Sequence, residues 1–229
     1  MSTAIEIVKL EKEYCLGKVS VQALRNINVN LKKGEFVAVV GASGSGKTTL
    51  LNIIGTLDKA THGKVYLEGK DLSNLNEKSL VEIRRRKIGF IFQFYNLMPV
   101  LTAFENVELP MIIAGVPKKE ATKRARDLLA AVGLNERANH RPDELSGGQQ
   151  QRIAIARALA NQPTVILADE PTGDLDSASG EQVMKLLRKL SKEQGITVLA
   201  ATHDVSILNL ADRELRMKDG QIISDEKLR

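Results

Sequence analysis

Two glycine-containing segments of this sequence have residue types that can hold phosphate. Residues 41–48 read Gly-Ala-Ser-Gly-Ser-Gly-Lys-Thr and fit the P-loop pattern, in which glycines let backbone N–H groups approach phosphate oxygens. Lys47 can then reach the β- and γ-phosphates, and the Thr48 hydroxyl can ligate Mg²⁺. Residues 145–149 read Leu-Ser-Gly-Gly-Gln, where Ser146 is a predicted helix N-cap at a second potential anion site. The first segment alone can wrap one triphosphate, so the second needs a separate explanation.

The residues on either side of 41–48 match the context that this motif requires. Residues 36–40 are apolar and mostly β-branched, which predicts a buried parallel strand. Apolar residues at helical spacing over 48–54 predict a helix, whose N-terminus adds partial positive charge near the phosphates. Strand, glycine loop and helix together predict a nucleotide-binding site.

Two adjacent carboxylates follow another predicted strand. Asp169 and Glu170 come directly after the apolar residues 165–168, and ligands of open α/β sheets bind at the carboxyl ends of strands. An aspartate at such a position in a P-loop protein supports Mg²⁺, and Glu170 is then free to polarise a water for attack on the γ-phosphate. The alternative is a solvated acidic turn before Pro171, which the buried strand running into the two acids disfavours.

Gln93 and His203 also follow predicted strands and could converge on the mouth of the P-loop. A neutral amide such as Gln93 can ligate Mg²⁺ and orient water without titrating, although many glutamines only cap strand ends. His203 lies beside Asp204 at its strand end, and the residues alone leave a catalytic and a structural role equally open.

Strand and helix patterns alternate along most of the chain. Strands are predicted at residues 5–9, 19–31, 35–40, 64–68, 88–92, 164–168 and 196–200, with a loop at 15–18. Helices are predicted at residues 48–57, 77–86, 103–115, 118–132, 147–160 and 177–194. This order predicts an α/β fold with a mostly parallel core sheet, helices on both of its faces, an N-terminal antiparallel β layer and an inserted α-helical sub-domain. We expect one domain over residues 1–229, with a core at 1–93 and 146–229 and the sub-domain at about 94–145.

Composition narrows the class of protein. The 229 residues carry a net charge of +5, but aromatic residues make up only 3% and tryptophan is absent, which disfavours stacking of single-stranded nucleic acid. The basic run at 84–87 ends a predicted helix, where it complements the helix dipole. No apolar run approaches the roughly 18 residues of a membrane span, and the N-terminus does not resemble a signal peptide, so a cytosolic or peripheral protein is expected. Cys15 is the only cysteine, which excludes an intrachain disulfide.

Taken together, the motifs resemble those of ABC transporter ATPase domains, over essentially the whole chain. The segments that carry the resemblance, in the order of that family, are residues 41–48, Gln93, the family's signature sequence at 145–149, Ile-Leu-Ala-Asp-Glu at 166–170, Asp-Leu-Asp at 174–176 and His203. The helical insert before the signature matches the family's α-helical sub-domain. Residues 90–97, 105–107 and 168–173 look closest to the lipoprotein-release and macrolide-export type ATPases.

The resemblance implies roles for individual residues. Tyr14 would stack on adenine, and Glu170 would be the catalytic base, acting with His203 at the γ-phosphate and with Lys47. Magnesium would be held by Thr48 and Gln93, with Asp169 behind them. The P-loop contacts to ATP would come from Gly41, Ala42, Ser43, Gly44, Ser45, Gly46, Lys47, Thr48 and Thr49. The signature contacts, made to ATP on the other subunit, would come from Ser146, Gly147, Gly148 and Gln149, with Asp176 at the dimer interface. Asp174 departs from the family pattern, in which many members have a small residue or asparagine at this position.

The function that the resemblance implies is the ATP-binding subunit of an ABC transporter. Two copies would pair head to tail around two ATP–Mg²⁺ and drive a separate membrane permease that docks near the Gln93 loop, at the cytoplasmic face of the membrane. An exporter or a lipoprotein, peptide or macrolide system is expected. A regulator of a permease-like partner in cell-wall processes, without transport, is the alternative.

Two further classes stay open but are less well supported. A nucleic-acid-linked ABC ATPase would carry long coiled-coil insertions or a second ATPase domain, and neither is present. A P-loop GTPase would carry an Asn-Lys-x-Asp segment, which is also absent. No nucleic acid is therefore expected as a partner.

Overall fold

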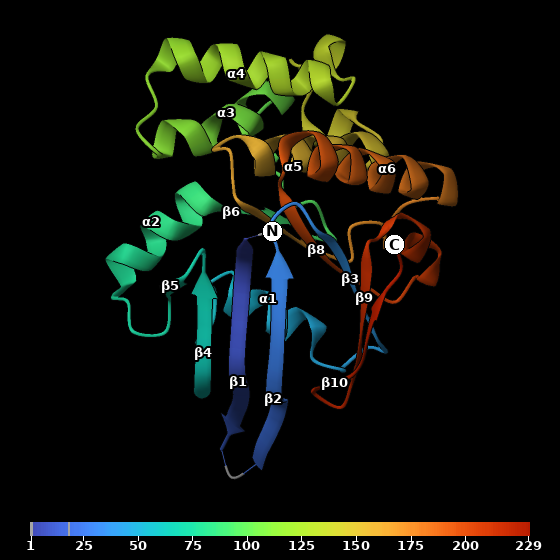
Figure 1. Cartoon of the computed structure of the whole chain (residues 1–229). Coiled ribbons are helices and arrows are strands. Elements are labelled where there is room, and N and C mark those ends of the chain that lie inside the picture. Colours follow the sequence, from blue (N-terminus) through green and yellow to red (C-terminus); the bar gives the residue numbers. More distant parts are fainter. Residues whose placement is uncertain (1, 18) are drawn as a thin grey trace.

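The computed structural model of the protein describes residues 2–17 and 19–229 and contains two β-sheets (Figure 1). The larger sheet has the strand order β10 (Gln221–Lys227), β9 (Arg213–Lys218), β3 (Phe36–Val40), β8 (Thr197–Thr202), β7 (Val165–Asp169) and β6 (Ile88–Ile91). Neighbouring strands from β9 to β6 are parallel, and β10 pairs antiparallel to β9. The second sheet is antiparallel, with the order β2 (Val19–Lys32), β1 (Thr3–Leu16), β4 (His62–Leu67) and β5 (Lys70–Asp71).

Helices cover both faces of the larger sheet. The α-helices are α1 (Lys47–Ile54), α2 (Glu77–Lys87), α3 (Ala103–Ile113), α4 (Lys118–Ala131), α5 (Gly147–Leu159) and α6 (Ser177–Gln194). Short 3₁₀ helices span Asn135–Arg137, Pro142–Glu144 and Val205–Leu210. Successive residues of a strand point to opposite faces. On one face, side chains such as Val37 and Val39 therefore pack with α1 and the antiparallel sheet, and on the other Phe36 packs with α5 and α6. This α/β architecture confirms the predicted fold class.

Helices α3 and α4, in the green and yellow part of the chain in Figure 1, pack with α5 around a further hydrophobic core. Fully buried residues of α3 and α4, including Val107 and Leu129, pack together with Ile153 of α5. Helix α5 therefore contributes to this core and to the core of the larger sheet. The limits of the helical sub-domain, at about residues 94–145, remain a prediction.

Most element limits agree with the predictions within two residues, and the exceptions have local causes. Strand β1 is much longer than the predicted 5–9. The prediction stops at residue 9 because Lys9 has a φ of +47° and a register shift here interrupts the alternation of apolar residues. The loop predicted at 15–18 is reduced to a turn at Gly17, and Lys18 lies outside the described residues. Helix α1 stops before the predicted Leu57, because Thr56 is left-handed with a φ of +58°.

Within residues 2–17 and 19–229, no helix combines the length and the hydropathy that crossing a bilayer requires.

Candidate active site

The P-loop connects β3 to α1 and lines a cavity. Helix α1 begins after Gly46, which has a φ of 103°, and no side chain caps this N-terminus. Gly46 tolerates no side chain, because a Cβ would lie 2.7 Å from the carbonyl oxygen of Ala23. Since Gly44, Gly46 and the first residues of α1 line a cavity, the uncapped N–H groups of this turn are available to an anion there.

Lys47 is packed against the loop that it follows. Its side chain is 7% exposed, and its ammonium donates to the carbonyl oxygens of Gly41 over 2.7 Å and Ala42 over 3.2 Å. Nζ also lies 3.8 Å from Oε1 of Glu170. The charge of Lys47 is thus held between the P-loop and the carboxylate that the sequence analysis selected as a base.

Side chains whose oxygen atoms can bind a hard cation lie near Lys47. Thr48 Oγ1 donates to Asp169 Oδ1 over 3.2 Å, and Gln93 lines the same cavity. Burial raises the pKa of Asp169, opposed by the Thr48 hydrogen bond and the charge of Lys47, while the charge of Glu170 adds to the rise. Hydroxyl, amide and carboxylate oxygens are the donors that Mg²⁺ uses together with substrate phosphates. Within the described residues, no group of three or more His, Cys, Asp or Glu side chains could hold a metal by itself.

Glu170 is fixed in an unusual backbone conformation. Its φ is +46°, its N–H donates to the carbonyl oxygen of Ala201 over 2.9 Å, and its own carbonyl oxygen accepts from Gly173 N over 3.1 Å. On the side chain, His203 Nδ1 lies 3.0 Å from Oε2 and His203 N donates to the same oxygen over 3.4 Å. Positive φ in a non-glycine residue is uncommon and costly, and strained residues of this kind cluster at functional sites.

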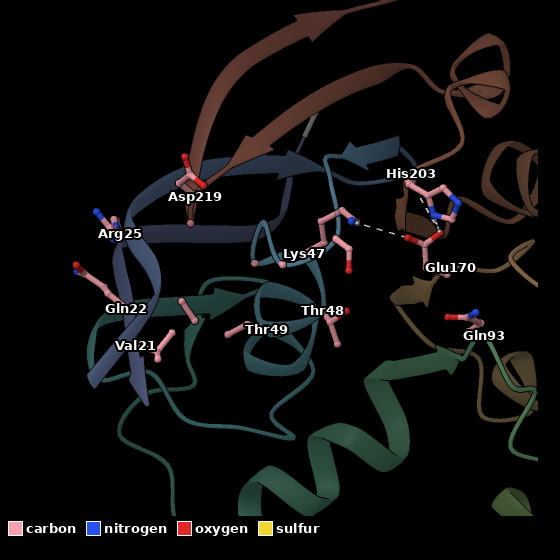
Figure 2. Close-up of a pocket in the computed structure, with 15 residues that line it drawn as sticks. Val21, Gln22, Arg25, Lys47, Thr48, Thr49, Gln93, Glu170, His203 and Asp219 are labelled. Carbon is pink, nitrogen blue, oxygen red and sulfur yellow. Dashed lines mark hydrogen bonds and ion pairs between the residues drawn. The ribbon is translucent and has the colours of Figure 1, made fainter. Parts of the chain in front are cut away.

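Lys47, Thr48, Gln93, Glu170 and His203 line one cavity of about 950 Å³, shown in Figure 2. Asp169 is not part of this lining and is linked to it through its hydrogen bond with Thr48. Lys47, Glu170 and His203 lie at one end, with Thr48 and Gln93 close to them. This arrangement brings the predicted phosphate, metal and water-activating residues to one place.

The other end of the cavity is lined by residues that the sequence analysis did not select. Val21, Gln22 and Arg25 come from β2, and Asp219 comes from the turn between β9 and β10 (Figure 2). Val21 is an exposed apolar side chain on this wall, at 47% exposure. The end at Lys47 and Glu170 is therefore charged, and at the other end the exposed side chain of Val21 adds apolar surface among polar and charged residues.

Tyr14 lies next to that second end, but it is not among the residues that line the cavity. It is the cross-strand partner of Val21. Its hydroxyl donates to Asp58 Oδ2 over 2.7 Å, and Lys12 Nζ lies 4.6 Å from its ring centroid. Because Lys12 lies over one face of the Tyr14 ring, the predicted contact with adenine would have to use the other face or the ring edge.

The second glycine segment starts α5, as predicted, and lies outside this cavity. Ser146 Oγ accepts from Gln149 N over 3.3 Å, and Gln149 Oε1 accepts from Ser146 N over 2.9 Å, which is a reciprocal capping box. A Cβ on Gly147 would lie 2.7 Å from the Tyr95 hydroxyl oxygen. None of residues 145–149 lines the P-loop cavity of the same chain.

Asp176 caps a different helix. Its Oδ1 accepts from Ser179 N over 3.0 Å at the start of α6, and its side chain is on the surface. The predicted place of Asp176 at an interface between two copies is not tested by these contacts.

Arg157 is a residue of this region that the sequence analysis did not select for a role. Its guanidinium donates to the carbonyl oxygens of Tyr95, over 2.8 Å, and Asn96. These two residues follow Gln93 and are both left-handed, with φ of 59° and 49°. Arg157 therefore ties the segment after Gln93 to the helix that Ser146 begins.

Comparisons with known proteins agree with this geometry. Residues 24–173 match the family model described as ABC transporter. The lipoprotein-releasing system ATP-binding protein LolD of Aquifex aeolicus is 52% identical over 204 residues, which cover 89% of this chain and 91% of that protein. The macrolide export ATP-binding/permease protein MacB of Vibrio parahaemolyticus is 50% identical over 221 residues, covering 96% of this chain but 34% of the relative. This chain thus spans about a third of that relative's length.

A solved structure extends the likeness to three dimensions. The dimeric structure of a post-hydrolysis state of the ATP-binding cassette MJ0796 bound to ADP and Pi aligns with a TM-score of 0.91 and 50% sequence identity. The alignment covers 98% of this chain and 99% of that one.

Proposed function

The chain belongs to the ABC transporter family, and from this premise we propose that two copies pair head to tail to hydrolyse ATP for a membrane permease. Each copy contributes two half-sites, the P-loop cavity and the signature segment at 145–149. The observation that carries the proposal is that the signature segment does not line the P-loop cavity of its own chain. A second chain that supplies its Ser146 helix start to this cavity explains both phosphate-binding segments. The dimeric state of the MJ0796 cassette, bound to ADP and Pi, supports this pairing.

Within one cavity, the proposal gives each group a task. The P-loop amides of residues 41–49 and Lys47 hold the phosphates of ATP, whose base lies toward Val21 and Tyr14. Thr48, Gln93 and Asp169 would hold Mg²⁺, which supplies charge neutralisation at the β- and γ-phosphates when bound. From the partner chain, Ser146, Gly147, Gly148 and Gln149 close over the γ-phosphate, with Asp176 at the interface.

Glu170 and His203 carry the hydrolytic step. Glu170 takes a proton from a water whose oxygen attacks the γ-phosphorus, and the bond from this phosphorus to the bridging oxygen of ADP breaks. The contact of His203 with Glu170 Oε2 supports a place for its ring at the γ-phosphate. Loss of the γ-phosphate removes the ligand that joins the two chains, and the dimer loosens.

An apolar groove supports the proposed docking of the permease near the Gln93 loop. The groove has a volume of about 510 Å³ and is bounded by α2, β6, the segment after Gln93 and α3. Its apolar lining includes Leu57, Phe92, Met98 and Ile113, which are partly or largely exposed. The basic side chains of Arg84 and Arg85 stand at its edge. An amphipathic segment of a permease fits this surface, which would hold the protein at the cytoplasmic face of the membrane.

The class of transporter follows from the named relatives. LolD belongs to a lipoprotein-releasing system and MacB to macrolide export, so an exporter or a related mechanotransmission system is the proposed setting. The helical sub-domain at about residues 94–145 would then link the docked permease to the signature segment.

A substitution of the proposed base tests the function. Glu170→Gln keeps the size of the side chain but removes its basicity, so steady-state phosphate release should fall by about 100-fold or more. Glu181→Gln, in an exposed pair with Lys185 on α6, is the matched control and should retain the wild-type rate. Unchanged turnover in Glu170→Gln would remove Glu170 from the role of base.

A further inference from the structure

Tyr14 is held at its hydroxyl and on one ring face by two residues that have no role in the proposal above. Its hydroxyl donates to Asp58 Oδ2 over 2.7 Å. Lys12 Nζ donates to Asp58 Oδ1, also over 2.7 Å, and to the carbonyl oxygen of Lys59 over 2.8 Å. The same ammonium lies 4.6 Å from the Tyr14 ring centroid, within the range of a cation–π contact. One carboxylate and one ammonium therefore fix both the direction and the tilt of the phenol ring.

Asp58, which accepts the Tyr14 hydroxyl, is itself held in place by backbone contacts. Asp58 Oδ1 accepts from Lys59 N over 2.7 Å, and Asp58 N donates to the carbonyl oxygen of Asn52 in α1 over 3.2 Å. The Lys12 side chain is 12% exposed. Because α1 is the helix that follows the P-loop, the ring of Tyr14 is fixed relative to the helix that starts at the phosphate cradle.

The ring stands beside the end of the cavity that Val21 lines. Tyr14 and Val21 are directly opposite in the β1–β2 ladder, so their side chains emerge on the same face of the sheet. Val21 lines the cavity, and so does Thr49 of α1. With Lys12 on one ring face, only the other face and the ring edge can receive a ligand.

The ionisation of the pair keeps these contacts formed at neutral pH. Burial and the hydrogen bond to Asp58 raise the pKa of Tyr14, so its hydroxyl remains a donor. Burial tends to raise the pKa of Asp58, but hydrogen bonds from Lys12, Tyr14 and Lys59 bring it below the ordinary value, so the carboxylate remains ionised.

We propose that Asp58 and Lys12 are positioning residues, which hold Tyr14 as a one-sided stacking platform for the purine base of the bound nucleotide. This inference rests on the proposed contact between Tyr14 and adenine and extends it to the residues that orient the ring. Neither Asp58 nor Lys12 touches the triphosphate in this arrangement. Their effect must therefore depend on the base and must act through Tyr14.

The test compares ATP with inorganic tripolyphosphate, which has the phosphates but no base. Affinities of the intact protein for both ligands, with Mg²⁺, are measured by titration calorimetry. Asp58→Asn and Lys12→Met should each weaken ATP binding about 3- to 10-fold, as expected from the loss of one hydrogen bond or charge contact. Tripolyphosphate affinity should stay within about twofold of wild type, and Lys12→Arg should recover part of the ATP affinity.

Matched controls come from another Lys–Asp pair, within the antiparallel sheet to which Lys12 belongs. Lys64 and Asp71 form an ion pair of 3.5 Å on β4 and β5. Asp71→Asn and Lys64→Met should leave both affinities unchanged. In a Tyr14→Ala background, Asp58→Asn should cause no further loss of ATP affinity, because a positioning residue has no effect without the ring it positions.

Each contrary result has a distinct meaning. If Tyr14→Ala weakens ATP binding but Asp58→Asn and Lys12→Met behave as the controls do, the inference is wrong and the adenine contact of Tyr14 stands. If Tyr14→Ala itself has no effect on ATP, the proposed adenine contact is wrong and the inference falls with it. An equal loss for tripolyphosphate, or a further loss in the Tyr14→Ala background, also overturns the inference.

Discussion

His203 contacts one oxygen of Glu170 twice: its Nδ1 lies 3.0 Å from Oε2, and its backbone N–H donates to the same oxygen over 3.4 Å. The other oxygen of Glu170 lies 3.8 Å from Lys47 Nζ. The carboxylate is therefore held between the end of β8 and the P-loop. Its orientation depends on His203, whose side chain is 68% exposed.

This contact predicts the effect of His203→Ala. Loss of the imidazole removes one of the two contacts to Glu170 Oε2 and the proposed donor at the γ-phosphate, so kcat should fall about 10- to 100-fold. The KM for ATP should change much less, because the P-loop and Lys47 remain. Steady-state kinetics separate the two constants, and a raised KM with unchanged kcat would place His203 in ATP binding instead.

Asp169→Asn should separate stability from activity. Burial raises the pKa of Asp169, so the folded state binds the proton more tightly than the unfolded chain and the ionised form is a cost at neutral pH. The variant should therefore have a higher free energy of unfolding than wild type at pH 7, without nucleotide or Mg²⁺. The gain should shrink as the pH falls through the folded-state pKa toward the ordinary value of 3.8.

The same variant should lose ATPase activity, about 100-fold at millimolar Mg²⁺, because an amide supports a cation less well than a carboxylate. Urea unfolding over a pH series and phosphate release at graded Mg²⁺ concentrations give the two measurements. A variant that is less stable than wild type at pH 7 would contradict the burial argument.

Arg157→Met should destabilise the protein by about 1–3 kcal/mol, because two carbonyl oxygens of the segment after Gln93 lose a charged donor. Arg157→Lys should recover only part of this loss, since one ammonium cannot reproduce the fork of the guanidinium. Arg126→Met, at an exposed position of α4, is the control. Guanidinium unfolding midpoints measure the difference, and equal midpoints for Arg157→Met and the control would show that the contact is not stabilising.

The parts of the protein that could be predicted from its sequence have strong local signals. Helix α6 has the predicted limits because Asp176 caps its start, Gly195 at its end is left-handed with a φ of 66°, and an apolar stripe runs between them. The P-loop and the pair Asp169–Glu170 were predicted because short apolar strands run directly into polar residues.

The parts that could not be predicted depend on contacts between distant residues. Arg157 and Tyr95 are 62 residues apart, and Tyr14 and Asp58 are 44 apart. No local pattern indicates that an arginine in a helix will bind carbonyl groups of two left-handed residues. The sequence also selects Glu170 as a candidate base but does not predict its φ of +46° or its contact with His203. Both depend on the folded edge where β7 and β8 end.

The central claim is that the cavity of one chain is completed by the signature segment of another, and the mass of the complex in solution tests it most directly. Light scattering after gel filtration of the Glu170→Gln chain should give a dimer with ATP and Mg²⁺ and a monomer with ADP. Adding Ser146→Arg, which places a bulky charge at the start of α5, should abolish the dimer but preserve ATP binding to the single chain. A Glu170→Gln chain that stays monomeric with ATP, or a dimer that persists with Ser146→Arg, would contradict the account.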